Sequence, residues 1–240
     1  MLEVKCLKKD FGGLHAVKGI SFSVAKGEVL GFLGPNGAGK STTMRMITGF
    51  LPPTSGTAVV CGHDIVADPV AAKRCIGYLP ESAPSYRAMT VVDFLSFIAS
   101  ARGLRDPKAR VEAVIREASL EPVAKRTIET LSKGYRQRVC FAQAIIHDPQ
   151  VLIMDEPTDG LDPNQKFTVR EMIKEMAAQG KAIIISTHIL EEVDAVCTRA
   201  LIIARGEIKA DGTPDKLRAM DPSGKLDVVF RNLTMEKEGK

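Results

Sequence analysis

The chain has 240 residues, of which 45% are hydrophobic and 26% are charged, and its formal net charge is +4. This length and apolar content are enough for one sizeable core, in a single domain or in a core with a subdomain. The mild positive charge is spread along the chain without a dense Lys/Arg block among aromatics, so we expect no nucleic acid as a partner. The five Cys show no C-x-x-C spacing and are interpreted as reduced thiols.

Nothing in the sequence indicates that the chain enters a membrane by itself. The first residues, MLEVKCLKKD, lack the apolar stretch of a signal peptide, and we expect no such peptide. No apolar run approaches the length that a membrane-spanning helix needs. Any role at a membrane is therefore expected to depend on a partner.

The first part of the chain predicts short β-strands separated by Gly, Pro and Asp. Strands are expected at residues 2–7, 21–24, 29–33, 57–60 and 75–79. The early runs at residues 18–24 and 57–60 suggest a small antiparallel sheet. VLGFL, residues 29–33, is uniformly apolar, as is typical of a strand covered on both faces. It leads into a Gly-rich loop and then a helix expected over about residues 41–50.

Residues 81–148 have a different pattern and predict three helices without strands. Thr90 and Asp93 form a capping box before apolar positions with helical spacing. A second helix is expected at about residues 108–119, and a third after LSKGY, which begins at Leu131. We therefore predict a helical subdomain inserted into an α/β core.

The core is expected to resume with apolar strands at residues 151–154 and 182–185. Asp162 and Pro163 supply an N-cap and a first-turn proline for the helix between these strands. Another short helix follows from Ile189. Alternating apolar strands and helices predict a mostly parallel sheet covered by helices.

Two features are expected near the C-terminus. Residues 199–212 predict a hairpin that turns at Arg205 and Gly206. The tail from Asp221 is polar except for LDVVF, residues 226–230, which we interpret as a possible lone strand.

GPNGAGKST, residues 34–42, contains a complete P-loop pattern. Its glycines let backbone N–H groups converge on phosphate oxygens, and the N-terminus of the next helix adds partial positive charge. Lys40 is expected to reach the β- and γ-phosphates, and the Ser41 hydroxyl to ligate Mg²⁺. A chance match is the competing interpretation, and the predicted strand before the loop and helix after it argue against that.

Further polar residues follow the predicted core strands. Asp155 ends the strand VLIMD and is expected in the Mg²⁺ shell, and Glu156 is expected to orient and deprotonate the attacking water. A solvated turn is the alternative for this acidic pair. His188, after IIIST, is expected to donate to a γ-phosphate oxygen, with a polar cap as the alternative. The other histidines, His15, His63 and His147, are interpreted as surface or structural residues.

Together these motifs resemble one family, the nucleotide-binding subunits of ATP-binding cassette (ABC) transporters. The resemblance covers about residues 2–220, with every motif in order. GPNGAGKST is similar to the Walker A motif, LSKGYRQRV to the signature usually written LSGGQ, LIMDEPTDGLDP to Walker B with the D-loop, and STH to the switch histidine. This ordered set is far more specific than the P-loop alone.

The resemblance implies a fold and a division of the chain. The fold is α/β: a P-loop NTPase (RecA-like) core with a mostly parallel sheet, a small antiparallel β subdomain and an inserted helical subdomain. Residues 1–80 and 149–220 would form the ATP-binding core with its β subdomain. Residues 81–148 would form the helical signature subdomain, and residues 221–240 a C-terminal tail.

The resemblance also implies a function and partners. Members of the family hydrolyse ATP with Mg²⁺ as two copies that meet head to tail, each ATP lying between one copy's P-loop and the other copy's signature. Ser132 and Gly134 would therefore bind the γ-phosphate of ATP held by a second copy of the chain. Membrane-spanning permease subunits are the other expected partners, and they would hold the protein at the cytoplasmic face of the cell membrane.

Further binding residues are implied by position. Phe11 falls where the family places an aromatic side chain that stacks on adenine, Val17 falls near the same base, and Asp162 matches the D-loop acid. Catalytic roles are implied for Glu156, His188 and Lys40. The complete set implied to bind ATP is Phe11, Val17, Gly34, Asn36, Gly37, Ala38, Gly39, Lys40, Ser41, Thr42, Ser132, Gly134 and Asp162; the set implied to bind Mg²⁺ is Ser41, Glu81 and Asp155.

The sequence departs from the family pattern at two motifs. Glu81 replaces the Gln that usually ends the Q-loop; a carboxylate can ligate Mg²⁺ but cannot donate a hydrogen bond. In the signature, Lys133 replaces a Gly and Tyr135 replaces the Gln. Ser132 and Gly134 remain, so we expect γ-phosphate binding to remain.

Two other functions are alternatives to a transporter ATPase. Soluble ABC ATPases that act on ribosomes or DNA usually carry two cassettes or a long coiled coil, and the stretch between Lys40 and Ser132 has no room for a coiled coil. A small-molecule kinase would need an acceptor-binding lid and would leave the signature unexplained. Among transporters, the sequence resembles the branch that drives exporters of drugs, lipids or polysaccharides more than importers, and the cargo would be chosen by the membrane subunit.

Overall fold

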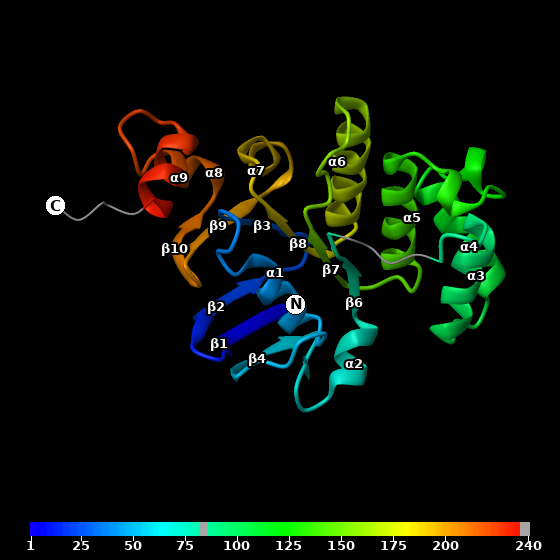
Figure 1. Cartoon of the computed structure of the whole chain (residues 1–240), viewed down its shortest axis with the longest axis horizontal. Helices are drawn as coiled ribbons and strands as arrows, with labels where there is room; N and C mark the ends of the chain where they lie inside the picture. Colours follow the sequence, from blue (N-terminus) through cyan, green and yellow to red (C-terminus); the bar gives the residue numbers. More distant parts are fainter. Residues whose placement is uncertain (82–85, 236–240) are drawn as a thin grey trace.

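The structure, a computed structural model, describes residues 1–81 and 86–235, whose strands form two sheets with helices around them (Figure 1). The strands are β1 (Leu2–Phe11), β2 (Leu14–Val24), β3 (Val29–Leu33), β4 (Ser55–Val60), β5 (His63–Asp64), β6 (Ile76–Leu79), β7 (Val151–Asp155), β8 (Ala182–Thr187), β9 (Arg199–Ala204) and β10 (Glu207–Gly212). The helices are α1 (Lys40–Ile47), α2 (Pro69–Arg74), α3 (Val91–Ala101), α4 (Pro107–Glu117), α5 (Lys133–Ile145), α6 (Pro163–Ala178), α7 (Leu190–Val196), α8 (Pro214–Arg218) and α9 (Leu226–Thr234), with short 3₁₀ turns η1 (Glu121–Val123) and η2 (Ile128–Thr130).

The smaller sheet is antiparallel, in the order β2-β1-β4-β5. β1 and β2 form a long hairpin whose register runs from the pair Leu2 and Val24 to the pair Phe11 and Leu14. β4 pairs with the other edge of β1. This sheet matches the expected one, and its first hairpin is longer than its short apolar runs predicted.

The larger sheet has the order β10-β9-β3-β8-β7-β6 and is parallel except for β10, which pairs antiparallel with β9. The register aligns the carboxyl ends of three strands, because Leu33 of β3 pairs with Thr187 of β8, and Asp155 of β7 pairs with Ser186 of β8. Loops that leave these strands therefore start at one edge of the sheet, where ligands bind in open parallel sheets.

The core lies on both faces of the larger sheet, and the side chains of β3 alternate between them. Val29 and Leu33 pack in the cluster that includes α5, α6 and α7, whereas Leu30 and Phe32 pack in the cluster that includes α1 and the smaller sheet. Every residue of β3 is buried, as the uniformly apolar run predicted. The P-loop is thus anchored by a strand that is covered on both sides.

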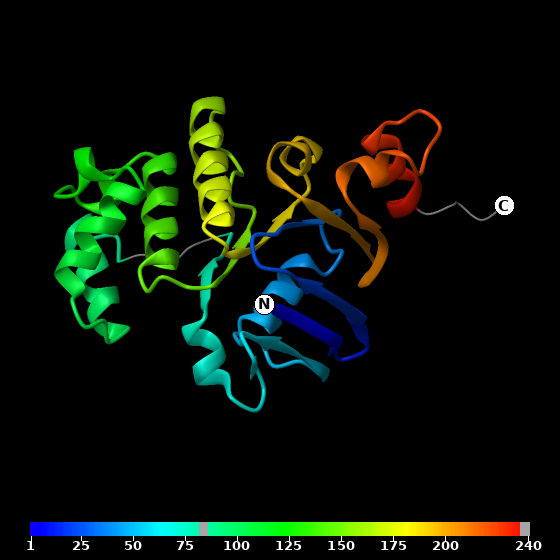
Figure 2. The same ribbon diagram turned by 180° about the vertical axis from the view of Figure 1, so that it is seen from behind.

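Helices α3, α4 and α5 contact one another and gather at one side of the larger sheet in both views (Figures 1 and 2). Each begins with a side-chain cap: Thr90, Asp106 and Ser132 each accept a hydrogen bond from a backbone N–H three residues later. The three expected helices are present, and α5 begins at the second residue after Leu131, so the signature forms its first turn.

The expectation of a lone strand at residues 226–230 is wrong, because these residues lie in the helix α9. Leu226, Val229, Phe230 and Leu233 recur at helical spacing and pack against the main core cluster. Four apolar residues among five favoured a strand locally, but the next apolar position, Leu233, completes a helical stripe. Helices α2 and α8 were not expected.

Among the described residues, no helix is both long enough and apolar enough to cross a membrane.

Candidate functional site

The P-loop follows β3 and wraps the N-terminus of α1. Gly39 is the N-cap of α1 and has a φ of 102°, and an added Cβ would clash with the backbone oxygen of Ala16. The glycine therefore allows both the left-handed turn and the close approach of β2. The first turn of α1 contains no acidic side chain, so its backbone N–H groups point at the loop with their positive partial charge uncompensated.

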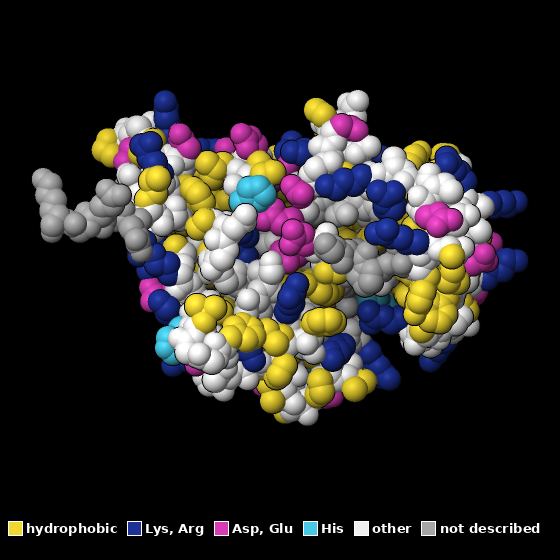
Figure 3. All heavy atoms as spheres, in the orientation of Figure 1, with side chains coloured by type: hydrophobic (Ala, Val, Ile, Leu, Met, Phe, Trp, Pro, Cys, Tyr) yellow, Lys and Arg dark blue, Asp and Glu magenta, His cyan; other side chains and the backbone are white. Residues whose placement is uncertain are grey.

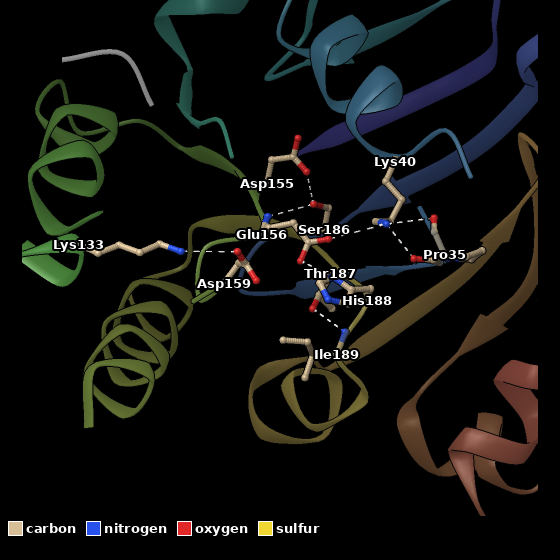
Figure 4. Close-up of polar contacts among 11 residues, drawn as sticks. Pro35, Lys40, Lys133, Asp155, Glu156, Asp159, Ser186, Thr187, His188 and Ile189 are labelled. Carbon is tan, nitrogen blue, oxygen red and sulfur yellow. Dashed lines mark hydrogen bonds and ion pairs between the residues drawn. The ribbon is translucent and has the colours of Figure 1, made fainter. Parts of the chain in front are cut away.

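Lys40 is 6% exposed and folds back over the P-loop. Its Nζ donates to the carbonyl oxygens of Gly34, at 2.8 Å, and Pro35, at 3.3 Å, and lies 3.8 Å from Glu156 Oε1 (Figure 4). Burial lowers the pKa of Lys40, and the carboxylates of Glu156, Asp155 and Glu81 oppose that shift in this order. One ammonium thus faces acidic groups from two strand ends.

Glu156 lies between Lys40 and His188. Its φ of 52° is left-handed, and its backbone N–H donates to the backbone oxygen and hydroxyl of Ser186 in β8, at 3.1 and 3.2 Å. His188 Nδ1 is 2.9 Å from Glu156 Oε2. The sharp turn after β7 is thereby held by β8, and it directs the Glu156 side chain, only 11% exposed, to Lys40 and His188 (Figure 4).

Asp155 is 1% exposed and accepts a short hydrogen bond from the Ser186 hydroxyl. This hydrogen bond between the neighbouring strands β7 and β8 holds the Asp155 carboxylate at the end of β7, where the loop begins. The sequence indicated Asp155 and His188, but it did not single out Ser186, although this residue stands in the STH motif.

A cavity of about 600 Å³ opens at this edge of the sheet. It is lined by Phe11, Leu14, Ala16, Asn36, Gly37, Ala38, Gly39, Lys40, Ser41, Thr42, Glu81, Glu156, Asp159 and His188. Its lining divides into the apolar side chains Phe11, Leu14 and Ala16 of β1 and β2, and a charged part made by Lys40 and the acidic residues. That division suits a molecule with an apolar flat part and a charged part.

Two predicted residues near the adenine end are placed differently from each other. Phe11 is 46% exposed and lines the cavity, as a stacking ring requires. Val17 is fully buried in the core, and its neighbour Ala16 lines the cavity instead. Side chains of successive residues in a strand point to opposite faces of the sheet. Ala16 therefore faces the cavity, and Val17, the next residue of β2, faces the core.

The remaining predicted residues lie outside this cavity. Ser132 caps α5 and accepts from Tyr135 N–H at 3.4 Å, and Gly134 is buried in the first turn of that helix. Asp162 caps α6 and accepts from Gln165 N–H at 2.9 Å. None of the described residues that line the cavity comes from the signature.

The oxygen groups at the charged end fit a hard divalent cation. Ser41 and Glu81 line the same cavity as Glu156, and Asp155 is held directly behind them by Ser186. Hydroxyl and carboxylate oxygens are the ligands that Mg²⁺ prefers. Figure 3 shows acidic side chains gathered at the centre of this face beside a histidine, with Lys and Arg side chains toward α5 and α6.

A P-loop between a buried strand and a helix, with acidic residues at the ends of neighbouring parallel strands, defines the class of P-loop NTPases. A family model described as "ABC transporter" matches residues 17–159. The chain therefore belongs to the ABC transporter family, as an ATP-binding subunit: it binds ATP and is an ATPase. The family and fold predicted from the sequence are confirmed.

Individual relatives cover nearly the whole chain. The linearmycin resistance ATP-binding protein LnrL of Bacillus subtilis (strain 168) is 41% identical over 219 residues, 90% of this chain and 70% of that protein. The Nod factor export ATP-binding protein I of Rhizobium sp. (strain N33) is 37% identical over 218 residues, 90% of this chain and 72% of that protein. The solved structure of an ATP-binding subunit of an ABC transporter is 33% identical, with a TM-score of 0.87 over 98% of this chain and 100% of that one.

Proposed function

We propose that two copies of this chain close head to tail around two ATP molecules and drive export through membrane-spanning partner subunits. The observation that carries this proposal is the position of the signature. Ser132 and Gly134 begin a helix whose N–H groups suit an anion, yet they lie outside the cavity of their own P-loop. A second copy would give this helix N-terminus a phosphate to bind.

Within one site, the residues are assigned the following roles. Lys40 and the amides of the P-loop bind the phosphates, and Phe11 stacks on the base. Glu156 accepts a proton from the attacking water, and His188, 2.9 Å away, orients the Glu156 carboxylate and donates to the γ-phosphate. Preorganised charges of this kind supply most of the rate enhancement in phosphoryl transfer.

Mg²⁺ is the metal that the oxygen groups of the site fit. Ser41, Asp155 and Glu81 would hold it, and when bound it neutralises charge on the phosphates. The Ser186 hydroxyl donates a hydrogen bond to Asp155 and holds its carboxylate in place. Glu81 adds a further negative charge opposite Lys40.

The partner subunits are proposed to dock near α3. Tyr86 and Phe97, 59% and 46% exposed, lie edge to face with ring centroids 5.5 Å apart, and Figure 3 shows hydrophobic side chains gathered over this region. Exposed aromatic clusters of this kind mark interaction surfaces. We place this docking surface over residues 81–105, of which residues 82–85 lie outside the described part. Such docking would place the chain at the cytoplasmic face of the membrane.

Export is proposed on two grounds. One relative is named as a Nod factor export protein and another as a linearmycin resistance protein. The sequence itself resembles the exporter branch around residues 76–95 and 155–163.

The division of the chain into residues 1–80 with 149–220, residues 81–148 and residues 221–240 is proposed on the resemblance to ABC transporter subunits.

The substitution Glu156→Gln tests the proposal, because it keeps the shape of the side chain and removes the base. We expect ATP binding to persist and turnover to fall by about 10²–10⁴-fold. We also expect the variant to form a dimer with ATP that light scattering detects, since bound ATP stabilises the closed pair by mass action.

Two controls accompany this measurement. Glu112→Gln, an exposed residue on α4, should leave both turnover and dimerisation unchanged. Omitting ATP should leave Glu156→Gln monomeric. A Glu156→Gln protein that hydrolyses ATP at the wild-type rate would falsify the role of Glu156, and one that binds ATP but stays monomeric would remove the head-to-tail dimer.

A further inference from the structure

Lys133 occupies a position that is unfavourable for a cation. It is the first residue of α5, and the first turn of this helix contains no acidic side chain. The N-terminus of a helix carries partial positive charge, so a lysine there is repelled unless an anion compensates. The compensating group in this chain is Asp159, whose Oδ2 lies 3.7 Å from the Lys133 ammonium (Figure 4).

The lysine side chain lies directly on the loop that contains Asp159. Gly160 follows Asp159 with a φ of 62°, and a Cβ added to this glycine would overlap the Lys133 ammonium. Glycine at position 160 thus leaves the space that the Lys133 ammonium occupies. The same loop has no space for a larger residue at position 160 while Lys133 keeps this orientation.

Two more contacts join the same helix to the same segment. Gln137, one turn after Lys133, donates from Nε2 to the backbone oxygen of Pro157 at 3.1 Å, in a partly buried hydrogen bond. On the other side, Gly134 lies so close to Gln165 that an added Cβ would overlap its side chain. The signature helix α5 thus contacts residues 157–165 at three places: Asp159, Pro157 and Gln165.

This segment begins immediately after the proposed base. Asp159 N–H donates to the backbone oxygen of Glu156 at 3.1 Å, which closes the turn that carries the Glu156 side chain. Asp159 also lines the nucleotide cavity together with Glu156 and His188. A force on the signature helix therefore reaches the turn of Glu156 through Asp159.

We propose that Lys133 is a positioning residue that acts through Asp159 to tie the signature helix to the Glu156 turn of its own chain. The inference rests on the proposed function, in which the signature binds the second copy's ATP. Occupation of the neighbouring site then helps to set the position of Glu156 in the chain's own site. The lysine that departs from the family signature thereby links the two sites.

Turnover of single and double variants tests the link. Lys133→Met and Asp159→Asn should each lower kcat about two- to fivefold, the range open to one exposed ion pair, with the KM for ATP unchanged. The double variant should be no slower than the slower single variant, because both changes remove one contact. Lys133→Arg keeps the charge and should retain the wild-type kcat.

A matched control is available on α6. Lys174 forms an ion pair with Glu171 at 3.0 Å, and the two side chains are 50% and 44% exposed, close to the 56% and 53% of Lys133 and Asp159. Lys174→Met makes the same charge change and should leave kcat unchanged. Additive losses in the double variant, or an equal loss in Lys174→Met, would overturn the proposal.

Mixed dimers decide which site Lys133 serves. With Lys133→Met on one copy and Glu156→Gln on the other, the remaining active site belongs to the lysine-substituted copy, and its rate should fall two- to fivefold. With both substitutions on one copy, the remaining site belongs to the unchanged copy and should be faster than in the first arrangement. The opposite order would show that Lys133 acts on the partner's ATP instead.

The two proposals fail separately. If Glu156→Gln forms no dimer with ATP, the proposed function is lost before Lys133 is tested. If that dimer forms and the Lys133 and Asp159 substitutions are additive, only the link between the sites is lost.

Discussion

At the residue scale, the charged end of the site is built from groups that are held before they act. Glu156 has one carboxylate oxygen near Lys40 and the other near His188, and its backbone is fixed by Ser186. Three carboxylates, those of Glu156, Asp155 and Glu81, lie near the single ammonium of Lys40. The carboxylates therefore repel one another more than Lys40 alone can offset. Such an excess of negative charge favours a divalent cation beside the phosphates.

Glu81 is the residue where this balance can be tested. Glu81→Gln removes one carboxylate opposite Lys40 and restores the family residue, so we expect the Mg²⁺ concentration for half-maximal turnover to rise about three- to tenfold. Turnover at saturating Mg²⁺ should change much less. Titration of ATPase activity with MgCl₂ at fixed ATP measures both values, with Glu112→Gln as the control. An unchanged Mg²⁺ requirement would contradict a metal role for Glu81.

Sequence reasoning predicted the charged end of the site better than its apolar end. Lys40, Asp155 and His188 end or follow buried parallel strands, and strand order alone brings such residues to one edge. The apolar end depends on which face of β2 is exposed, and a shift of one residue exchanges Val17 for Ala16. Asp159 was missed because its role depends on a contact with Lys133 that sequence distance does not show.

At the element scale, helices and buried strands with strong periodicity were predictable, and short segments were not. β3, β7 and β8 are uniformly buried, as their apolar runs indicated. α9 was expected as a strand because Val228, Val229 and Phe230 have high β-propensity, yet packing of one helical face against the core overrides that preference. α2 was not predicted because it has only six residues, and its one sequence signal is the N-cap Asp68 followed by Pro69.

His147 links two elements and predicts a pH dependence of stability. It follows α5, and its Nε2–H donates to the backbone oxygen of Ile76 in β6 at 2.9 Å, while the buried Nδ1 has no hydrogen-bond partner among residues 1–81 and 86–235. Burial, and then the charge of Arg102, lower the pKa of His147 to about 4. Protonation would place a second N–H where no acceptor receives it.

The sign of the effect follows from the two pKa values. Above about pH 6.5 the ring is neutral in both states and contributes nothing to the pH dependence. Between pH 6.5 and about 4 the unfolded chain binds a proton that the folded chain does not, so stability falls by up to about 2–3 kcal/mol. His147→Gln keeps an N–H for Ile76 and should lose less stability than the wild type over this range.

Urea unfolding at pH 7.5 and pH 5 measures the difference. His63→Gln, at an exposed histidine next to Asp68, serves as the control and should keep the wild-type loss. Equal losses in the wild type and in His147→Gln would show that His147 does not titrate as its burial implies.

At the scale of the whole molecule, the P-loop and the signature of one chain lie apart, and the proposed dimer would make each one half of a nucleotide site. The P-loop, Glu156 and His188 meet at the edge of the larger sheet, whereas Ser132 starts a helix in the group α3–α5 on one side of it (Figure 1). The contacts of Lys133 and Gln137 with residues 157–159 connect the halves within one chain. In the proposed head-to-tail dimer, a two-fold pair of such chains would complete both sites at once, because each surface is used twice.

This architecture predicts complementation between two inactive variants. Ser132→Arg leaves its own P-loop intact but blocks the site of its partner, and Glu156→Gln inactivates its own site but keeps its signature. Each variant alone should be inactive. In an equal mixture about half of the dimers pair the two variants and restore one of two sites, so activity should approach about one quarter of the wild type.

The measurement is ATP turnover of the mixture against each variant alone, after incubation long enough for subunits to exchange. Fluorescence energy transfer between donor-labelled Ser132→Arg and acceptor-labelled Glu156→Gln provides the check that subunits have exchanged. A mixture as inactive as its components, while energy transfer shows that mixed dimers have formed, would mean that each chain completes its own site. Recovery instead requires that the phosphate held by one P-loop meets the signature of the other chain.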